Sequence, residues 1–98
     1  MGTLEFEWDE AKDTSNQHKH GVSFTEAATV FADDHALLIG DPDHSDDEDR
    51  FILLGLSLPL RLLVVCHCCR KNEDTIRLIS ARKANRVESR QYTRRWFR

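Results

Sequence analysis

The longest apolar run of the sequence, residues 51–66, constrains the fold most strongly. Ser57, Pro59 and Arg61 interrupt this run, whereas a membrane-spanning helix needs about 18 or more apolar residues with few charges. The run therefore predicts two strands, 50–57 and 61–69, joined by a short turn through Pro59. Strands with such a short connection pair in antiparallel orientation, so we expect an antiparallel hairpin at the centre of the fold.

The segment before this hairpin begins with a predicted edge strand and a helix. Phe6 and Trp8 alternate with glutamates, a pattern that indicates a short strand. Asp9 is suited to cap a helix that extends to about residue 18, and Gly21 is suited to close it.

A second helix and a further strand are expected before residue 41. Ser23 and Glu26 have the spacing of a capping box, which predicts a helix to about residue 31. Its apolar stripe consists of Ala27, Val30 and Phe31. Residues 36–40 predict a strand, and residues 41–49 predict a turn followed by an acidic loop.

The segment after the hairpin predicts a strand over 75–80 and a C-terminal helix from residue 81. Ser80 would cap this helix, and Ala84, Val87 and Tyr92 would face inward. The predicted fold class is therefore α+β, with N-terminal helices followed by an antiparallel sheet and a C-terminal helix. A length of 98 residues is typical of one domain, and we assign residues 1–98 to it.

The charge of the chain is divided unevenly along its length. The net charge is −3, but residues 1–49 carry 14 acidic and 2 basic side chains, and residues 50–98 carry 12 basic and 3 acidic ones. This division excludes a uniformly basic nucleic-acid-binding surface. It is compatible with a local site for an anionic ligand in the second half.

Basic side chains that suit phosphate binding lie near the end of the chain. Arg77 lies within an apolar strand, between Ile76 and Leu78, which is an unusual place for a charge without a function. On the predicted helix, Arg82 and Arg86 are four residues apart and share a face, where guanidinium groups match phosphate oxygens. The alternative is a solvated basic face that pairs with the acidic half.

Three clustered cysteines surround a single histidine. Their odd number, at Cys66, Cys68 and Cys69, does not suit a disulfide framework and favours a reduced, cytoplasmic setting. Strand alternation separates Cys66 from His67, and no second cysteine pair completes a zinc site, so we predict no metal and no cofactor. The pKa of an ordinary histidine suits His67 to acid–base work on a ribose 2′-hydroxyl; the alternative is a hydrogen-bonded structural histidine.

Ordered blocks of the sequence resemble the BrnT family of toxins. The N-terminal signature of that family resembles residues 8–12 (Trp-Asp-Glu-Ala-Lys), Asn16, residues 19–24 (Lys-His-Gly-Val-Ser-Phe) and residues 26–27. The resemblance continues through residues 30–31, 43–45, Glu48 and Arg50, then 61–65, His67, 76–77, 79–84, Glu88 and Tyr92. It covers nearly the whole chain.

The resemblance implies a RelE-like ribonuclease toxin of a bacterial type II toxin–antitoxin system. Such a toxin cleaves RNA without a metal ion and arrests growth. The implied partner is a BrnA-type antitoxin, in a complex of two toxins and two antitoxins that contacts operator DNA mainly through the antitoxin. No membrane partner is expected. The charge division further predicts that acidic antitoxin segments cover the basic half of the chain.

We expect Arg77, Arg82 and His67 to carry catalysis. The two arginines would stabilise charge on the reacting phosphate, and His67 would act as acid or base. Further RNA contacts are assigned to Arg70, Lys83, Arg86 and Arg61.

One departure from the family pattern leaves other functions open. Cys68 and Cys69 stand where the family often has a hydroxyl residue and an acid, so Glu73 or Glu88 would have to replace that acid. The second hypothesis is therefore an inactive homologue that acts as a binding module and corepressor with its antitoxin. The third is a regulator that binds zinc through the cysteines.

Overall fold

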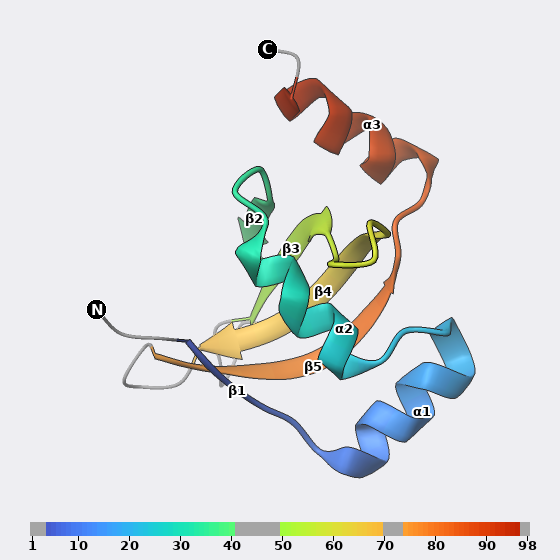
Figure 1. The fold of residues 1–98 in the computed structure, drawn as a ribbon, viewed down its shortest axis with the longest axis vertical. Coiled ribbons are helices and arrows are strands. Elements are labelled where there is room, and N and C mark those ends of the chain that lie inside the picture. The colour runs from blue at the N-terminus through green and yellow to red at the C-terminus, as the bar shows by residue number, and fades with distance from the viewer. Residues whose placement is uncertain (1–3, 41–49, 70–73, 97–98) are drawn as a thin grey trace.

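The structure is a computed structural model of the chain and describes residues 4–40, 50–69 and 74–96. Its elements follow the order β1(Glu5–Glu7), α1(Glu10–His20), α2(Phe24–Thr29), the short 3₁₀ helix η1(Val30–Ala32), β2(Leu37–Gly40), β3(Arg50–Leu56), β4(Leu62–Cys69), β5(Thr75–Lys83) and α3(Arg86–Trp96). The expected mixed α+β fold is confirmed (Figure 1). Within the described residues, no helix is long and apolar enough to span a membrane.

The five strands form one sheet in the order β1-β5-β4-β3-β2. The strands from β2 to β5 pair antiparallel, as the central hairpin predicted. The edge strand β1 instead runs parallel to β5 and pairs only with residues 75–77. The rest of β5, beyond Arg77, therefore has no strand on that side among the described residues.

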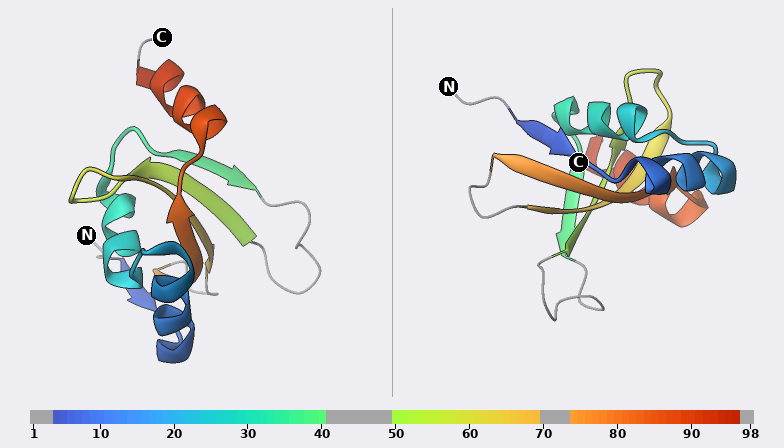
Figure 2. Two further views of the ribbon diagram at one scale, coloured as in Figure 1. Left: turned by 90° about the vertical axis from the view of Figure 1, so that its right-hand side faces the viewer. Right: turned by 90° about the horizontal axis from the view of Figure 1, so that it is seen from below.

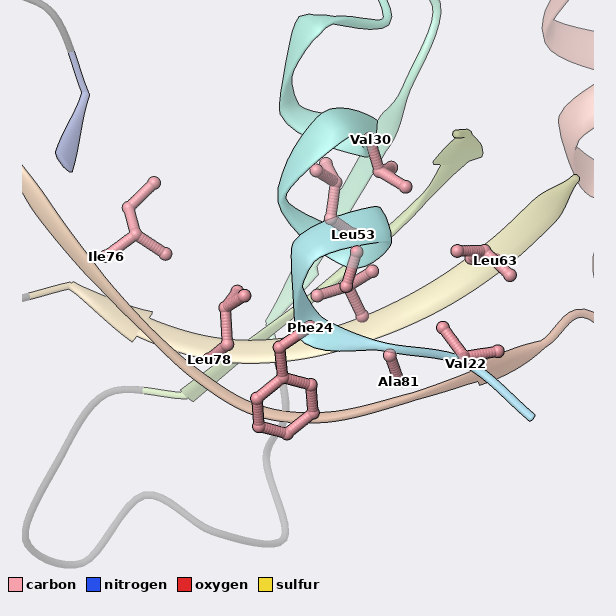
Figure 3. Packing of buried hydrophobic residues seen from close by; sticks show 10 residues of the cluster. Val22, Phe24, Val30, Leu53, Leu63, Ile76, Leu78 and Ala81 are labelled. Carbon is pink, nitrogen blue, oxygen red and sulfur yellow. The ribbon is translucent and has the colours of Figure 1, made fainter. Parts of the chain in front are cut away.

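The helices α2 and η1 cover one face of the sheet, which we call the helix face, whereas α1 is attached to the edge of β5 through Asn16 (Figures 1 and 2). Figure 3 shows Phe24 and Val30 packed with strand side chains of this face, among them Leu53, Leu63 and Leu78. All of these side chains are less than 9% exposed. Burial of this apolar surface is the main force that holds α2 and η1 on the sheet.

Local capping sets the boundaries of α1 and α2. The Asp9 carboxylate accepts hydrogen bonds from the N–H groups of Ala11 and Lys12, and Gly21 ends α1 in the left-handed conformation with φ 68°. Both residues were predicted for these roles. Ser23 caps α2 by accepting from the Glu26 N–H. The Glu26 carboxylate does not complete the capping box but instead binds Arg61 and Ser57.

The other face of the sheet is covered at one end by α3. Tyr92 is buried there against Leu54 and Val64, and its hydroxyl donates a hydrogen bond of 2.7 Å to Asp33. Figures 1 and 2 show α3 standing apart from α1 and α2. We call the part of this face that carries Arg50, Ile52, Cys66, Arg77 and Arg82 the open face.

The predicted start of the C-terminal helix is wrong. Strand β5 continues to Lys83 and α3 begins at Arg86, because Arg82 and Lys83 pair with β4 across the sheet. The actual helix start has a complete capping box, in which Asn85 accepts from the Glu88 N–H and Glu88 accepts from the Asn85 N–H. Val87, expected to face inward, is 61% exposed.

Candidate functional site

Strand alternation decides which predicted site residues lie on the open face. Ile76, Leu78 and Ala81 of β5 belong to the core on the helix face. Arg77 therefore projects from the opposite side. Arg82 does so too, because it is paired with Val64, which packs on that side. The structure thus places both arginines on the open face, although Arg82 reaches it from a strand and not from the predicted helix.

A hollow of about 310 Å³ lies on the open face, and we call it the arginine hollow. It is lined by Arg50, Ile52, Val64, Cys66, Ile79, Ser80 and Arg82. Its two basic lining residues, Arg50 and Arg82, come from β3 and β5. Arg50 lies at the first position of β3 and is half-buried.

The sequence reasoning missed Arg50 as a site residue. Its position in register is informative: Arg50 is paired with Cys68, which is in turn paired with Arg77. The two arginines therefore flank one cysteine and lie two strand spacings apart, roughly 10 Å. Like Arg77 in β5, Arg50 is an arginine in an otherwise apolar strand, and this pattern in the sequence could have identified it.

Each predicted catalytic arginine has a carboxylate partner. Nη1 of Arg77 lies 3.1 Å from Glu7 of β1. The Arg82 guanidinium makes two parallel hydrogen bonds of 2.8 Å to the carboxylate of Glu88. The Arg82 bond holds the pKa of Glu88 below its ordinary value despite partial burial, and the same bond raises the pKa of Arg82. A carboxylate that is ionised at neutral pH thus lies beside the arginine hollow.

His67 lies on the other side of the sheet from the two arginines. It is 2% exposed, and its ring packs edge-on against Phe31 of η1 at a centroid distance of 4.8 Å. Burial lowers its pKa, with the Val65 carbonyl opposing that shift weakly. The structure therefore does not bring His67 together with Arg77 and Arg82, because residues 63, 65 and 67 alternate toward the core.

The remaining predicted RNA contacts are dispersed. The guanidinium of Arg61 binds the Glu26 carboxylate through Nε at 2.8 Å and through Nη2. Lys83 is exposed, and its partner Leu63 places it on the helix face. Arg86 is exposed at the first position of α3. Arg70 lies outside the described residues.

The open face offers the chemistry of an anion-binding site. Two arginines and Ser80 line one hollow, and Arg77 lies on the same face, paired with Glu7. A guanidinium group presents a rigid fork of N–H donors that matches two oxygens of a phosphate. Among the described residues, no group of three His, Cys, Asp or Glu side chains could hold a metal ion.

Comparison with known proteins assigns the chain to a family. Residues 8–88 match the family model of the "ribonuclease toxin, BrnT, of type II toxin-antitoxin system". None of the curated proteins matches the chain. Among solved structures, the 1.1 Å crystal structure of the Brucella abortus ribonuclease toxin BrnT is similar, with a TM-score of 0.62 and 23% identity over 86% of this chain and 100% of that one. That likeness concerns the fold, whereas the family match covers most of the sequence, and the chain therefore belongs to the BrnT family of ribonuclease toxins of type II toxin–antitoxin systems.

Proposed function

We propose that this chain is a metal-independent, RelE-like endoribonuclease toxin and that the arginine hollow binds the phosphate at the cleaved bond. One observation carries the proposal: Arg50 and Arg82 line one hollow on the open face. A phosphate that gains charge in the transition state is stabilised best by donors already fixed around it. Strand positions fix the backbones of both arginines, whereas the Arg82 side chain must leave Glu88 to reach the phosphate.

The reaction requires a base for the 2′-hydroxyl, an acid for the leaving 5′-oxygen and positive charge around the phosphate. Arg50 and Arg82 supply charge at the cleaved bond, and Arg77 contacts a neighbouring phosphate. When Arg82 turns toward the phosphate, the Glu88 carboxylate loses its partner and accepts the 2′-hydroxyl proton. The 2′-oxygen then bonds to phosphorus as the P–O5′ bond breaks, and a solvent water protonates the leaving 5′-oxygen, which gives a 2′,3′-cyclic phosphate and a 5′-hydroxyl. The low pKa of Glu88 supports its ionised form as the resting state.

The position of His67 favours a second candidate function. A histidine that is sealed in the core has no contact with a substrate in the arginine hollow, so an acid–base role for His67 requires the sheet to open around it. A homologue that binds RNA or its antitoxin without cutting is therefore the alternative. In either case we propose a BrnA-type antitoxin as partner, in a complex of two toxins and two antitoxins.

Cleavage of a labelled RNA by the purified protein tests the proposal. Removal of one preorganised donor typically lowers the rate by about 10²–10³, so we expect a loss of that size for Arg50→Ala and for Arg82→Ala. Arg94→Ala, an exposed change on α3, is the matched control. Activity should persist in EDTA. Wild-type rates in both arginine variants would refute the assignment of the hollow.

A growth assay separates the two candidate functions. Induced expression of an active toxin arrests growth, and coexpression of the neighbouring antitoxin gene restores it. Arg50→Ala should abolish the arrest while still binding the antitoxin. If the wild-type chain causes no arrest but the pair binds operator DNA, the corepressor function is supported instead.

A further inference from the structure

A second depression lies on the other side of β5, between this strand and α1, and we call it the α1 groove. Its volume is about 160 Å³, and α1 contributes Lys12, Ser15, Asn16, Lys19 and His20 to its walls. Ile79 and Ser80 of β5 complete it. These two residues also line the arginine hollow, so the two depressions meet at the edge of β5.

The groove follows from the way α1 is attached to the sheet. Residues 12, 15, 16 and 19 lie on one face of a helix, and this face is turned toward β5. Asn16 is buried at its centre, where its side-chain amide donates to the Ala81 carbonyl at 2.8 Å and accepts from the Ala81 N–H at 3.1 Å. This pair of bonds replaces a neighbouring strand along the part of β5 that β1 leaves unpaired. Lys12 and Lys19 stand on either side of that attachment, roughly 10 Å apart along the helix.

The charge distribution marks this groove within the acidic half of the chain. Residues 1–49 contain 2 basic residues, Lys12 and Lys19, and both line the groove. The acidic side chains in the same helix are turned elsewhere. Glu10 accepts from the Trp8 indole, and Asp13 accepts from the Phe24 N–H at the start of α2. The lysines are therefore concentrated on the one side of α1 that adjoins the arginine hollow.

A local irregularity of β5 joins the two depressions. The pairing of β4 with β5 shifts between Cys66 and His67, which leaves Ile79 as an extra residue beside Ser80. Such a bulge bends the strand and often lies next to a functional site. Here it places two consecutive residues, Ile79 and Ser80, in the lining of both depressions.

We propose that the α1 groove binds backbone phosphates of the RNA strand that flank the phosphate in the arginine hollow. The single strand crosses the edge of β5 at Ser80 and continues along α1, where Lys12 and Lys19 contact successive parts of its backbone. This inference rests on the proposed function, because it extends the same RNA path. If the groove binds RNA in this way, the affinity for RNA depends on the length of the strand as well as on the nucleotides at the cleaved bond.

Binding of uncleavable 2′-O-methyl RNA, measured by fluorescence anisotropy at several salt concentrations, tests the proposal. The probes are a dodecamer, which is long enough to reach the groove, and a trinucleotide, which is long enough only for the hollow. We expect Lys12→Gln and Lys19→Gln to weaken binding of the dodecamer several-fold. The slope of log K against log salt is negative, and each variant should make it about 0.7 less steep, the value for one phosphate contact to a single strand. Affinity for the trinucleotide should not change.

Control variants separate this inference from the proposed function. Lys12→Arg and Lys19→Arg retain the charge and should restore dodecamer binding, whereas Arg94→Gln removes one charge far from the groove and should leave it unchanged. Arg82→Gln should weaken both probes. If the lysine variants lose affinity equally for both probes, or lose affinity for neither, the proposed RNA binding by the α1 groove is refuted. If Arg82→Gln binds the trinucleotide with wild-type affinity, the proposed phosphate binding by the arginine hollow is refuted instead.

Discussion

The side chain of Asn16 is the sharpest test of how this structure holds its first helix. It is 6% exposed, and its amide nitrogen donates to the carbonyls of Val22 and Ala81, both at 2.8 Å. Its oxygen accepts from the Ala81 N–H at 3.1 Å. Asn16→Ala removes all three bonds and leaves three backbone groups without these partners.

The expected loss follows from these three hydrogen bonds. Each contributes about 0.5–1.5 kcal/mol net, and alanine returns roughly 0.5 kcal/mol as a better helix former. Asn16→Ala should therefore lower the free energy of unfolding by about 1–4 kcal/mol. For a chain of this length each kcal/mol corresponds to roughly 4–8 °C in Tm. Thermal and urea denaturation followed by circular dichroism measure both quantities.

The variant Asn16→Asp refines the test because it keeps the shape of the side chain. It replaces the donor by a second acceptor that faces two carbonyl oxygens, and burial of an unpaired charge costs more than removal of the group. The aspartate variant should therefore be less stable than the alanine variant at pH 7.5. Its deficit should shrink in acid, where a protonated carboxyl can donate one bond. An aspartate variant as stable as the alanine variant at pH 7.5 would refute this account of the contact.

Three further predictions concern the remaining polar contacts and one strained turn. Tyr92→Phe removes the hydrogen bond to Asp33. Since hydrogen bonds to charged groups contribute about 1.5–3 kcal/mol, amide hydrogen exchange in α3 should accelerate roughly tenfold or more. Unchanged exchange would show that packing alone holds α3. The Arg61 hydrogen bond lowers the pKa of Glu26 below 4.5, against the effect of burial, so this pair stabilises the fold above the unfolded pKa and loses its effect as pH falls through the folded pKa. The stability difference between wild type and Glu26→Gln, measured by urea denaturation from pH 7 downward, should accordingly narrow in acid, and a constant difference would contradict the assignment. Leu60 has a φ of 68°, a conformation that costs most residues about 1–2 kcal/mol but that asparagine adopts more readily. Because Leu60 is 76% exposed, Leu60→Asn should raise Tm by a few degrees. A fall in Tm would indicate that the leucine has contacts that offset the strain.

Much of the fold could be read from local sequence signals. The hairpin was predicted as strands 50–57 and 61–69 and is observed as β3(Arg50–Leu56) and β4(Leu62–Cys69). Asp9 and Gly21 bound α1 as expected. These elements are predictable because each depends on groups close in the chain, namely a capping carboxylate, a glycine with positive φ or an interrupted apolar run.

The end of β5 shows where local signals were misread. The segment from Ala81 to Ala84 is rich in helix formers, and the sequence predicted a helix there. Pairing of Arg82 and Lys83 with β4 outweighs this propensity, since each residue added to a sheet gains backbone hydrogen bonds and cross-strand contacts. The capping box of Asn85 and Glu88 was present in the sequence and identifies the true helix start.

The sequence by itself determined the family, the α+β class and the concentration of arginines that suit a phosphate. Alternation also required His67 and Cys66 to lie on opposite faces of their strand. Only the tertiary structure decided which face α2 and η1 cover, and thereby buried His67 and left Arg82 on the open face. It also brought Arg50 to Arg82, and Lys12 to the edge of β5. The reason is physical: alternation fixes relative orientation within one strand, whereas the burial of each face depends on which distant segments pack against it.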